Sequence, residues 1–120
     1  YKTQKDTIVL EAPVNLDFWD RSTPLNTDTN QPLRIVCTAN LNPLKGQDIL
    51  LKAICDIQEN CIVTFVGQRL ETQKVYSTIL DQLTEQIRTK HPNITIEFLG
   101  WQDQKQVKQI IENSDLFVLP

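Results

Sequence analysis

Residues 33–46 read LRIVCTANLNPLKG, a short apolar run followed by a polar loop that ends in glycine. The run at residues 33–38 is rich in β-branched side chains, which is typical of a strand buried on both faces. Residues 46–59 then predict an amphipathic helix. The apolar face of that helix comprises Ile49, Leu50, Ala53, Ile54 and Ile57. A buried strand that leads through a loop into a helix indicates the first half of a β-α-β unit.

The same order of strand and helix recurs along the rest of the chain. Further strands are predicted at residues 62–66 (IVTFV), 94–99 (ITIEFL) and 116–119 (LFVL). Because strands that alternate with helices form β-α-β units, we expect an α/β fold with an open, Rossmann-like parallel sheet of about four strands and flanking helices. The apolar strands support parallel order, since neither face of such a sheet meets water.

Two more helices are predicted between these strands. The longer helix ends before Pro92, and its apolar residues recur at intervals of three and four: Tyr76, Ile79, Leu80, Leu83 and Ile87. The other helix begins at Asp103, which forms the pattern of a capping box with Gln106. Its apolar stripe comprises Val107, Ile110 and Ile111.

Residues 1–32 are polar and irregular and contain three prolines. We interpret them as a connector, or lead-in, to a domain that spans residues 33–120. One strand is predicted in this connector, near residues 7–11. Phe18 and Trp19 need apolar partners, and we expect them to cover an edge of the core. The alternative is that the two rings form a surface for a partner protein.

Composition excludes several classes of protein. A length of 120 residues fits one domain, and a net charge of −3 with a pI near 5.0 argues against binding to nucleic acid. Since no apolar run approaches the roughly 20 residues that span a bilayer, we expect neither a membrane span nor a signal segment. The three cysteines lack the close spacing of a zinc or redox site, which favours free thiols in a reducing, cytoplasmic location.

The three glycines of the chain mark one edge of the predicted sheet. Gly46, Gly67 and Gly100 each lie where a strand hands over to a helix. In a parallel sheet these junctions gather at the carboxyl ends of the strands, which is where open α/β sheets bind ligands. Glycine permits positive φ and lets the backbone approach a ligand closely. The alternative is that the glycines only make tight turns, but their common position favours a binding edge.

The loop at residues 39–46 carries the strongest chemical signal. It leads into a helix whose first N–H groups form a partial positive pole, and Lys45 adds a full charge beside that pole. Such an arrangement can bind phosphate oxygens, although a solvated lysine at a helix start explains the residue equally well. Neither the P-loop spacing GxxxxGK[ST] nor the dinucleotide pattern GxGxxG is present.

Residues 35–54, IVCTANLNPLKGQDILLKAI, resemble the start of the donor-binding domain in family 4 of the retaining glycosyltransferases, which have the GT-B fold. That family shows a hydrophobic strand, then G-R-L-x-P-x-K-G, then a helix such as xxLLxAF. Six residues match this pattern: Leu41, Pro43, Lys45, Gly46, Leu50 and Ala53. VTFVGQRLE, IEFLGW and SDLFVLP resemble later strands of the same domain, and residues 8–19 resemble its lead-in more loosely.

The resemblance implies a function and a site. The function would be transfer of a sugar, with retention of configuration, from a UDP- or GDP-sugar to a glycan or lipid-linked acceptor, in polysaccharide or glycoconjugate biosynthesis. Lys45, with Gly46 and Asn40, would bind the donor diphosphate. The residues that flank the donor and its nucleobase would be Gly67, Arg69, Gly100, Trp101 and Gln102. The family needs no bound metal, and we predict no cofactor, in keeping with the lack of an Asp/Glu/His cluster.

The chain also departs from the family pattern. Ala39 and Asn40 replace the glycine-arginine pair, and Arg69 replaces the second glycine after the second strand. Arg69 could supply the lost charge, but a solvated loop arginine is the simpler reading. The family continues past the position of Pro120 with the acidic residues that bind the ribose and sugar. We therefore expect the first half of a GT-B donor domain, inactive without those residues and without the N-terminal acceptor domain of a parent enzyme. Whether that parent docks on the inner face of a membrane stays open.

Two other classes of protein stay open as alternatives. A non-catalytic α/β domain of the flavodoxin or receiver type also alternates strand and helix. A receiver, however, would carry paired acids after the first strand and an aspartate after the third, where this chain has Ala39-Asn40 and Gly100-Trp101. A protein-interaction module would expose its large aromatic side chains, here Phe18, Trp19 and Trp101.

Overall fold

A computed structural model of the chain describes residues 13–21, 24, 28 and 30–120. These residues form one sheet with the strand order β3-β2-β1-β4, in which every pair is parallel. The strands are β1 (Leu33–Thr38), β2 (Cys61–Val66), β3 (Ile94–Gly100) and β4 (Leu116–Phe117). The predicted open parallel sheet is therefore confirmed. The strand predicted near residues 7–11 lies outside the described residues.

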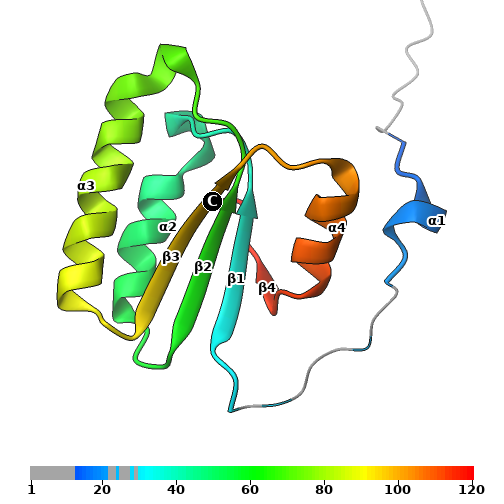
Figure 1. The fold of residues 1–120 in the computed structure, drawn as a ribbon, viewed down its shortest axis with the longest axis horizontal. Coiled ribbons are helices and arrows are strands. Elements are labelled where there is room, and N and C mark those ends of the chain that lie inside the picture. The colour runs from blue at the N-terminus through cyan, green and yellow to red at the C-terminus, as the bar shows by residue number, and fades with distance from the viewer. Residues whose placement is uncertain (1–12, 22–23, 25–27, 29) are drawn as a thin grey trace, which may run out of the picture.

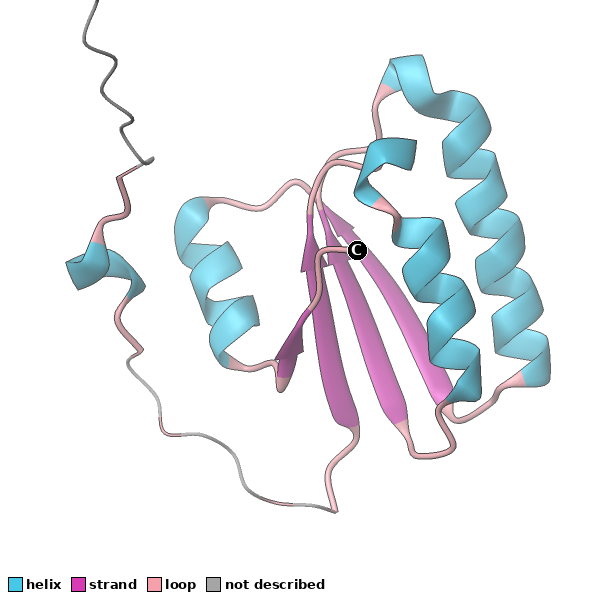
Figure 2. Ribbon diagram, turned by 180° about the vertical axis from the view of Figure 1, so that it is seen from behind, coloured by secondary structure: helices cyan, strands magenta, loops and turns pink. Residues whose placement is uncertain are grey.

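The helices lie on both faces of this sheet (Figures 1 and 2). One face is covered by α2 and α3, which run side by side, and the other by α4. The bounds are α1 (Leu16–Trp19), α2 (Gln47–Ala53), α3 (Lys74–Lys90) and α4 (Gln104–Glu112). Short 3-10 helices occur at η1 (Pro43–Lys45), η2 (Ile54–Asp56) and η3 (Glu71–Gln73). Within the described residues, none of the helices combines the length and the apolar composition needed to cross a bilayer.

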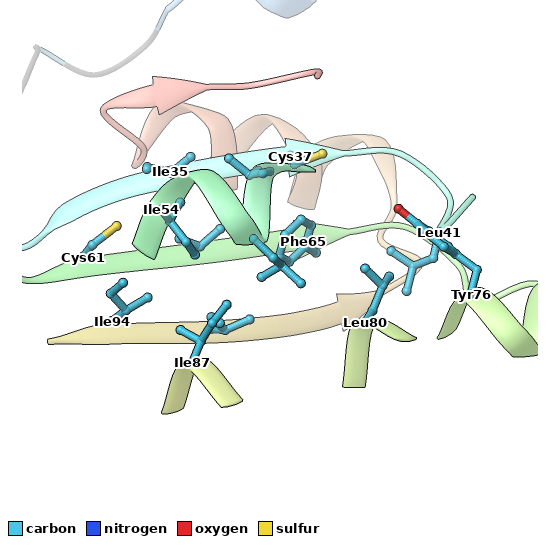
Figure 3. Close-up of a cluster of buried hydrophobic side chains, with 14 residues drawn as sticks. Ile35, Cys37, Leu41, Ile54, Cys61, Phe65, Tyr76, Leu80, Ile87 and Ile94 are labelled. Carbon is cyan, nitrogen blue, oxygen red and sulfur yellow. The ribbon is translucent and has the colours of Figure 1, made fainter. Parts of the chain in front are cut away.

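The core lies between strands β1–β3 and the pair α2 and α3 (Figure 3). Val63, Leu51 and Leu80 are fully buried there, and burial of such side chains is the main favourable term in folding. The ring of Phe65 stacks on that of Phe98, with centroids 4.9 Å apart. The core therefore joins the three longer strands and their two helices into one unit.

The helix after β1 differs from its prediction. Its α-helical part has seven residues, from Gln47 to Ala53, and η2 follows it. Its buried face holds Gln47, Leu50, Leu51 and Ile54, whereas Ile49 is 60% exposed and Ala53 is exposed as well. The spacing of the buried residues is that of one helix face. The prediction was right at Leu50, Ile54 and Ile57, and it was wrong at Ile49 and Ala53, because the face that packs on the core is shifted toward Gln47 and Leu51.

Strand β3 contradicts the expectation that neither face of the sheet meets water. Its burial alternates, with Ile94 and Ile96 buried and Thr95 and Glu97 exposed. β3 is an edge strand, and the helix on its exposed face, α4, packs over β1. The uncovered face borders a cavity of about 370 Å³ between β2, β3 and α4. Alternation of this kind is usual where one face of a sheet is solvated.

The predicted capping box of α4 is confirmed. The Gln106 N–H donates to Asp103 Oδ1 at 2.8 Å, and the Asp103 N–H donates to Gln106 Oε1 at 3.0 Å. The apolar stripe of this helix, Val107, Ile110 and Ile111, is half-buried. β4 covers two residues rather than the predicted four, although the Val118 N–H still donates to the Val36 carbonyl.

The N-terminal helix α1 packs on α4. Phe18 and Trp19 are half-buried and meet edge to face, with ring centroids 5.0 Å apart. Lys108 of α4 places its ammonium 5.5 Å from the Phe18 ring, and Arg21 donates to the Glu112 carbonyl at 3.2 Å. Phe18 therefore lies against α4 through Lys108, and Trp19 packs on Phe18.

The three cysteines are free thiols in the described part of the chain. Cys37 and Cys61 are buried and Cys55 is half-buried. Burial raises the pKa of the Cys37 and Cys61 thiols, because a low dielectric disfavours the thiolate. Since the thiolate is the reactive form, a raised pKa makes these two thiols unreactive, and their contribution is to the packing of the core.

Candidate functional site

The carboxyl ends of β1, β2 and β3 meet at one edge of the sheet, as the glycine positions predicted. Backbone hydrogen bonds join the loops that follow these strands. The Leu41 N–H donates to the Gln68 carbonyl at 3.0 Å, and the Gly67 N–H donates to the Gly100 carbonyl at 2.8 Å. The loops at residues 39–46, 67–70 and 100–103 therefore lie side by side.

Gly67 permits the closest of these approaches. Its φ is +152°, and a Cβ at this position would lie 2.0 Å from the Ala39 carbonyl oxygen. No side chain fits such a contact, because real Cβ atoms do not approach another heavy atom below 3.0 Å. Glycine at this position is thus required for the loop after β1 to pack on the loop after β2.

Asn40 ties the same two loops together. Its Oδ1 accepts a hydrogen bond from the Gln68 N–H at 3.0 Å, and its carbonyl accepts one from Gln47 Nε2 at 3.0 Å. Asn40, predicted among the residues that bind the donor diphosphate, therefore joins two loops of this edge.

The start of α2 presents fewer free N–H groups than predicted. The Asp48 N–H donates to the Tyr76 hydroxyl, and the Ile49 N–H donates to the Gly46 carbonyl. In η1, just before this helix, the Leu44 N–H donates to Asn42 Oδ1. Gly46 itself adopts the left-handed conformation, with φ +62°, where η1 ends and α2 begins. Because these amides already have partners, the helix pole at this edge is weaker than the sequence suggested.

Lys45 supplies the free positive charge of the edge. Its side chain is exposed and makes no hydrogen bond or ion pair with any residue that the structure describes. It lies in the loop after β1, and the Gly46 that follows it lies beside Pro120. An ammonium at such a position can approach an anion without first breaking a contact within the protein.

Arg69 is positioned by α3 and β3. Its guanidinium forms a two-point ion pair with Asp81, at 2.7 Å and 3.3 Å, and lies 4.9 Å from the centre of the Phe98 ring. Arg69 is an exposed loop arginine, as expected, and its ion pair with Asp81 is exposed to solvent as well. The partner, Asp81, lies about two turns into α3 and was not identified from the sequence.

The loop after β3 presents Trp101 to solvent. This side chain is 71% exposed, and Gly100 before it has φ +70°. Gln102 folds back, since its Nε2 donates to the Leu99 carbonyl at 2.9 Å. Gln102 also lines the cavity between the sheet and α4. An exposed indole at this edge offers a flat surface on which a ring of a ligand can stack.

A buried polar network below the edge was missed from the sequence. Tyr76 was assigned to an apolar helix face, yet its hydroxyl lies 3.2 Å from Gln47 Oε1 and 2.9 Å from Asp48 Oδ1. Figure 3 shows Tyr76 beside Leu41, at the end of the core nearest the loops. The signal that could have revealed it is Gln47, a polar residue three and four positions before two buried leucines.

Two groups of this network have shifted pKa values. Burial raises the pKa of Tyr76 to about 12, and the neighbouring Asp48 carboxylate adds to the shift. Partial burial acts to raise the pKa of Asp48, but hydrogen bonds from Tyr76 and Lys52 and the charge of Lys52 outweigh it, so the pKa is lowered. Tyr76 is therefore neutral and Asp48 ionised at neutral pH. In the described part of the chain, no three His, Cys, Asp or Glu side chains gather as a metal site would require.

Comparisons with known proteins agree with this architecture. The chain is similar in structure to Alr3699/HepE of Anabaena, solved in complex with UDP and glucose, with a TM-score of 0.63 and 23% identity over 72% of this chain. A second structure of that protein, in complex with UDP, gives the same TM-score and identity over 73% of this chain. The chain spans 22–23% of the length of Alr3699/HepE, and this likeness concerns the fold. No curated protein matches the sequence.

The family is shown by the sequence itself. The profile of the family described as Glycosyl transferases group 1 matches residues 18–120, which is most of the chain. The match includes all four strands and the three loops that meet at the edge of the sheet. The chain therefore belongs to the group 1 glycosyl transferases.

Proposed function

We propose that this edge of the sheet binds the diphosphate of a UDP- or GDP-sugar, as part of a glycosyltransferase. The observation that carries the proposal is Lys45, an exposed ammonium without an ion-pair partner among the described residues, in the loop that leads from the carboxyl end of β1 into α2. Membership in the group 1 glycosyl transferases supports it. That Alr3699/HepE, similar in fold, was solved with UDP supports it as well.

The proposed chemistry follows from the charge that develops at the leaving group. When a sugar leaves a nucleotide diphosphate, negative charge grows on the phosphate oxygen nearest the sugar. A fixed ammonium stabilises that charge more than it stabilises the ground state, and this difference lowers the barrier. Lys45 would donate to these oxygens, with the backbone of Gly46 and of Asn40 beside them. The proposed reaction retains the configuration of the sugar, and its acceptor is a glycan or a lipid-linked glycan.

The remaining site residues have proposed roles in binding the rest of the donor. The backbone at Gly67 would lie against the donor, with Arg69 next to it. Arg69 could contact the donor only if its ion pair with Asp81 broke. We therefore propose that its side chain mainly holds the loop after β2 against α3. Gly100, Trp101 and Gln102 would flank the nucleobase, with the exposed indole of Trp101 as a stacking surface.

The same reasoning assigns a role to each part of the chain. Residues 33–120 would form part of a donor-binding domain of GT-B type, and residues 1–32 would lead into it. The acidic residues that bind the ribose and sugar, and an acceptor-binding domain, would be supplied by other parts of a parent enzyme. Binding of the nucleotide is therefore the property to test in this chain.

Amide-resolved NMR of the chain during titration with UDP and with GDP tests the proposal. We expect one of the two nucleotides to bind weakly, with a Kd of about 1 mM, because only part of the donor would be contacted. The shifted amides should lie in the loops at residues 39–46, 67–70 and 100–103. Binding at another surface, or no change with either nucleotide, would overturn the proposal.

Lys45→Ala should weaken this binding at least about tenfold, since a charge-assisted hydrogen bond to phosphate contributes about 1.5–3 kcal/mol. The matched control is Lys90→Ala, which removes an equal charge from the last turn of α3. That change should leave the affinity the same. Equal effects of the two substitutions would show that net charge, and not the position of Lys45, governs binding.

A further inference from the structure

We propose that Tyr76 is a positioning residue for Lys45, acting through a chain of hydrogen bonds that begins at its buried hydroxyl and joins α3 to the loops after β1 and β2. The inference rests on the proposed nucleotide site and adds a residue that would not itself touch the nucleotide. Tyr76 is 6% exposed and lies in the first turn of α3. The chain runs from Tyr76 through Gln47 and Asn40 to Gln68.

The hydroxyl of Tyr76 uses both of its hydrogen-bonding functions. It accepts from the Asp48 N–H at 3.1 Å, and its single proton faces Asp48 Oδ1 at 2.9 Å and Gln47 Oε1 at 3.2 Å. All three atoms belong to the first turn of α2. The hydroxyl therefore sets the position of that turn relative to α3.

The amide of Gln47 transmits this constraint to the loop. Gln47 is fully buried, and its Nε2 donates to the Asn40 carbonyl at 3.0 Å. Because the nitrogen must face that carbonyl, the oxygen must face Tyr76, so the orientation of the amide is determined at both ends. Rotation of the amide would leave the buried Gln47 oxygen and the part-buried Asn40 carbonyl without donors, which is unfavourable.

The bond between Gln47 and Asn40 closes a loop that contains Lys45. Residues 40–47 begin and end at this bond, and Asn40 is joined in turn to the Gln68 N–H on the next loop. Lys45 therefore projects from a short segment whose two ends are joined to each other. A closed loop has less conformational freedom to lose when a ligand binds. The network would thus raise affinity for the diphosphate by preorganising the residue that contacts it.

The test compares nucleotide binding by Tyr76→Phe with binding by the unaltered chain. We expect UDP or GDP, whichever binds, to bind about fivefold to tenfold more weakly to the variant, which lacks only the hydroxyl. In a chain that already carries Lys45→Ala, Tyr76→Phe should have no further effect, because the hydroxyl acts through Lys45. An affinity that is unchanged by Tyr76→Phe, or an equal loss in both backgrounds, would overturn the inference.

Thr84→Val is the matched control. Thr84 is a buried residue of the same helix, and its hydroxyl has no partner among the described residues. Removing it should leave nucleotide binding unchanged. If Tyr76→Phe proves poorly folded, Gln47→Met breaks the same chain one step nearer to the loop while keeping the side-chain volume, and it should weaken binding to a similar extent.

Measurements without nucleotide separate this inference from the proposed function. In Tyr76→Phe the amides of residues 40–48 and of Gln68 should shift, and the Leu41 amide should exchange with solvent faster. If the unaltered chain bound neither nucleotide, the proposed function would fail, while these shifts would still report on the network. If it bound nucleotide and the loop amides of Tyr76→Phe stayed unchanged, the proposed role of Tyr76 would fail alone.

Discussion

Gly67 and Gly100 show how the same residue type meets different demands. Both have positive φ, at +152° and +70°. A Cβ at Gly67 would collide with the Ala39 carbonyl, whereas a Cβ at Gly100 would have no described heavy atom within 4 Å. Gly67 is therefore constrained by packing between two loops as well as by conformation. At Gly100 only the backbone conformation favours glycine.

Gly67→Ala should destabilise the chain by about 3 kcal/mol or more, because the loop after β1 must move away from β2. Gly100→Ala should cost only about 1–2 kcal/mol, the usual penalty for a side chain in the left-handed region. Urea denaturation of the two variants measures the difference. Similar losses of stability would show that the contact with Ala39 relaxes easily.

Tyr76 should make the free energy of unfolding decrease at alkaline pH. Its pKa of about 12 in the folded chain lies above the ordinary value of 10.0, so folding favours the protonated phenol. This contribution is fully present below pH 10 and is lost as the pH rises from 10 to 12. We expect the free energy of unfolding to fall over this window, with a smaller slope in Tyr76→Phe. Denaturation across the window tests this, and an identical slope in both proteins would contradict it.

At the scale of single elements, local signals predicted helix ends better than helix faces. The capping box of α4 and the end of α3 before Pro92 depend on residues within one turn, and both were found as expected. The buried face of α2 was predicted only in part, because Gln47 is held in the core by Tyr76 on another helix and by Asn40 in the preceding loop. A cap is a local interaction, whereas a face depends on what packs against it.

Asp103→Ala should destabilise α4 by about 1 kcal/mol, since it removes the acceptor for the Gln106 N–H. Hydrogen exchange of the amides at residues 107–111 should then be about fivefold faster, the factor that this energy gives. Lys105→Ala, in the same turn, serves as the control and should change these rates little. Equal rates in Asp103→Ala and the unaltered chain would indicate that α4 is stabilised by packing alone.

At the scale of the whole molecule, the two faces of the sheet are unequal. α2 and α3 cover one face with fully buried side chains such as Leu51 and Leu80. On the other face α4 contributes half-buried residues, and β4 pairs with β1 only at Ile35 and Val36. The candidate site lies on the well-packed part, since its loops follow β1, β2 and β3.

Hydrogen exchange should therefore divide the chain into two regions. Amides of β1, β2 and α3 should be the most protected and exchange only on global unfolding, while those of α4 and β4 should exchange through local opening. Added urea should accelerate exchange in the first region much more than in the second. Uniform protection along residues 33–117 would contradict this division.

The order of elements, their parallel pairing and the edge at which the loops meet were all predictable from the sequence. These features follow from periodicity, from caps and from glycine at strand ends, which are properties of neighbouring residues. Lys45 could be singled out in the same way, because its position beside Gly46 is local. The family followed from the same stretches, as the match over residues 18–120 shows.

The tertiary structure alone decided which side chains meet across elements. Tyr76 lies 28 positions after Asp48 and 29 after Gln47, and Arg69 lies 12 before Asp81. No local pattern reports such pairs, because their distance depends on how helices dock on the sheet and not on the preferences of either residue. For the same reason, only the folded structure shows that Lys45 has no ion-pair partner among the described residues. It also shows that Arg69 forms an ion pair with Asp81.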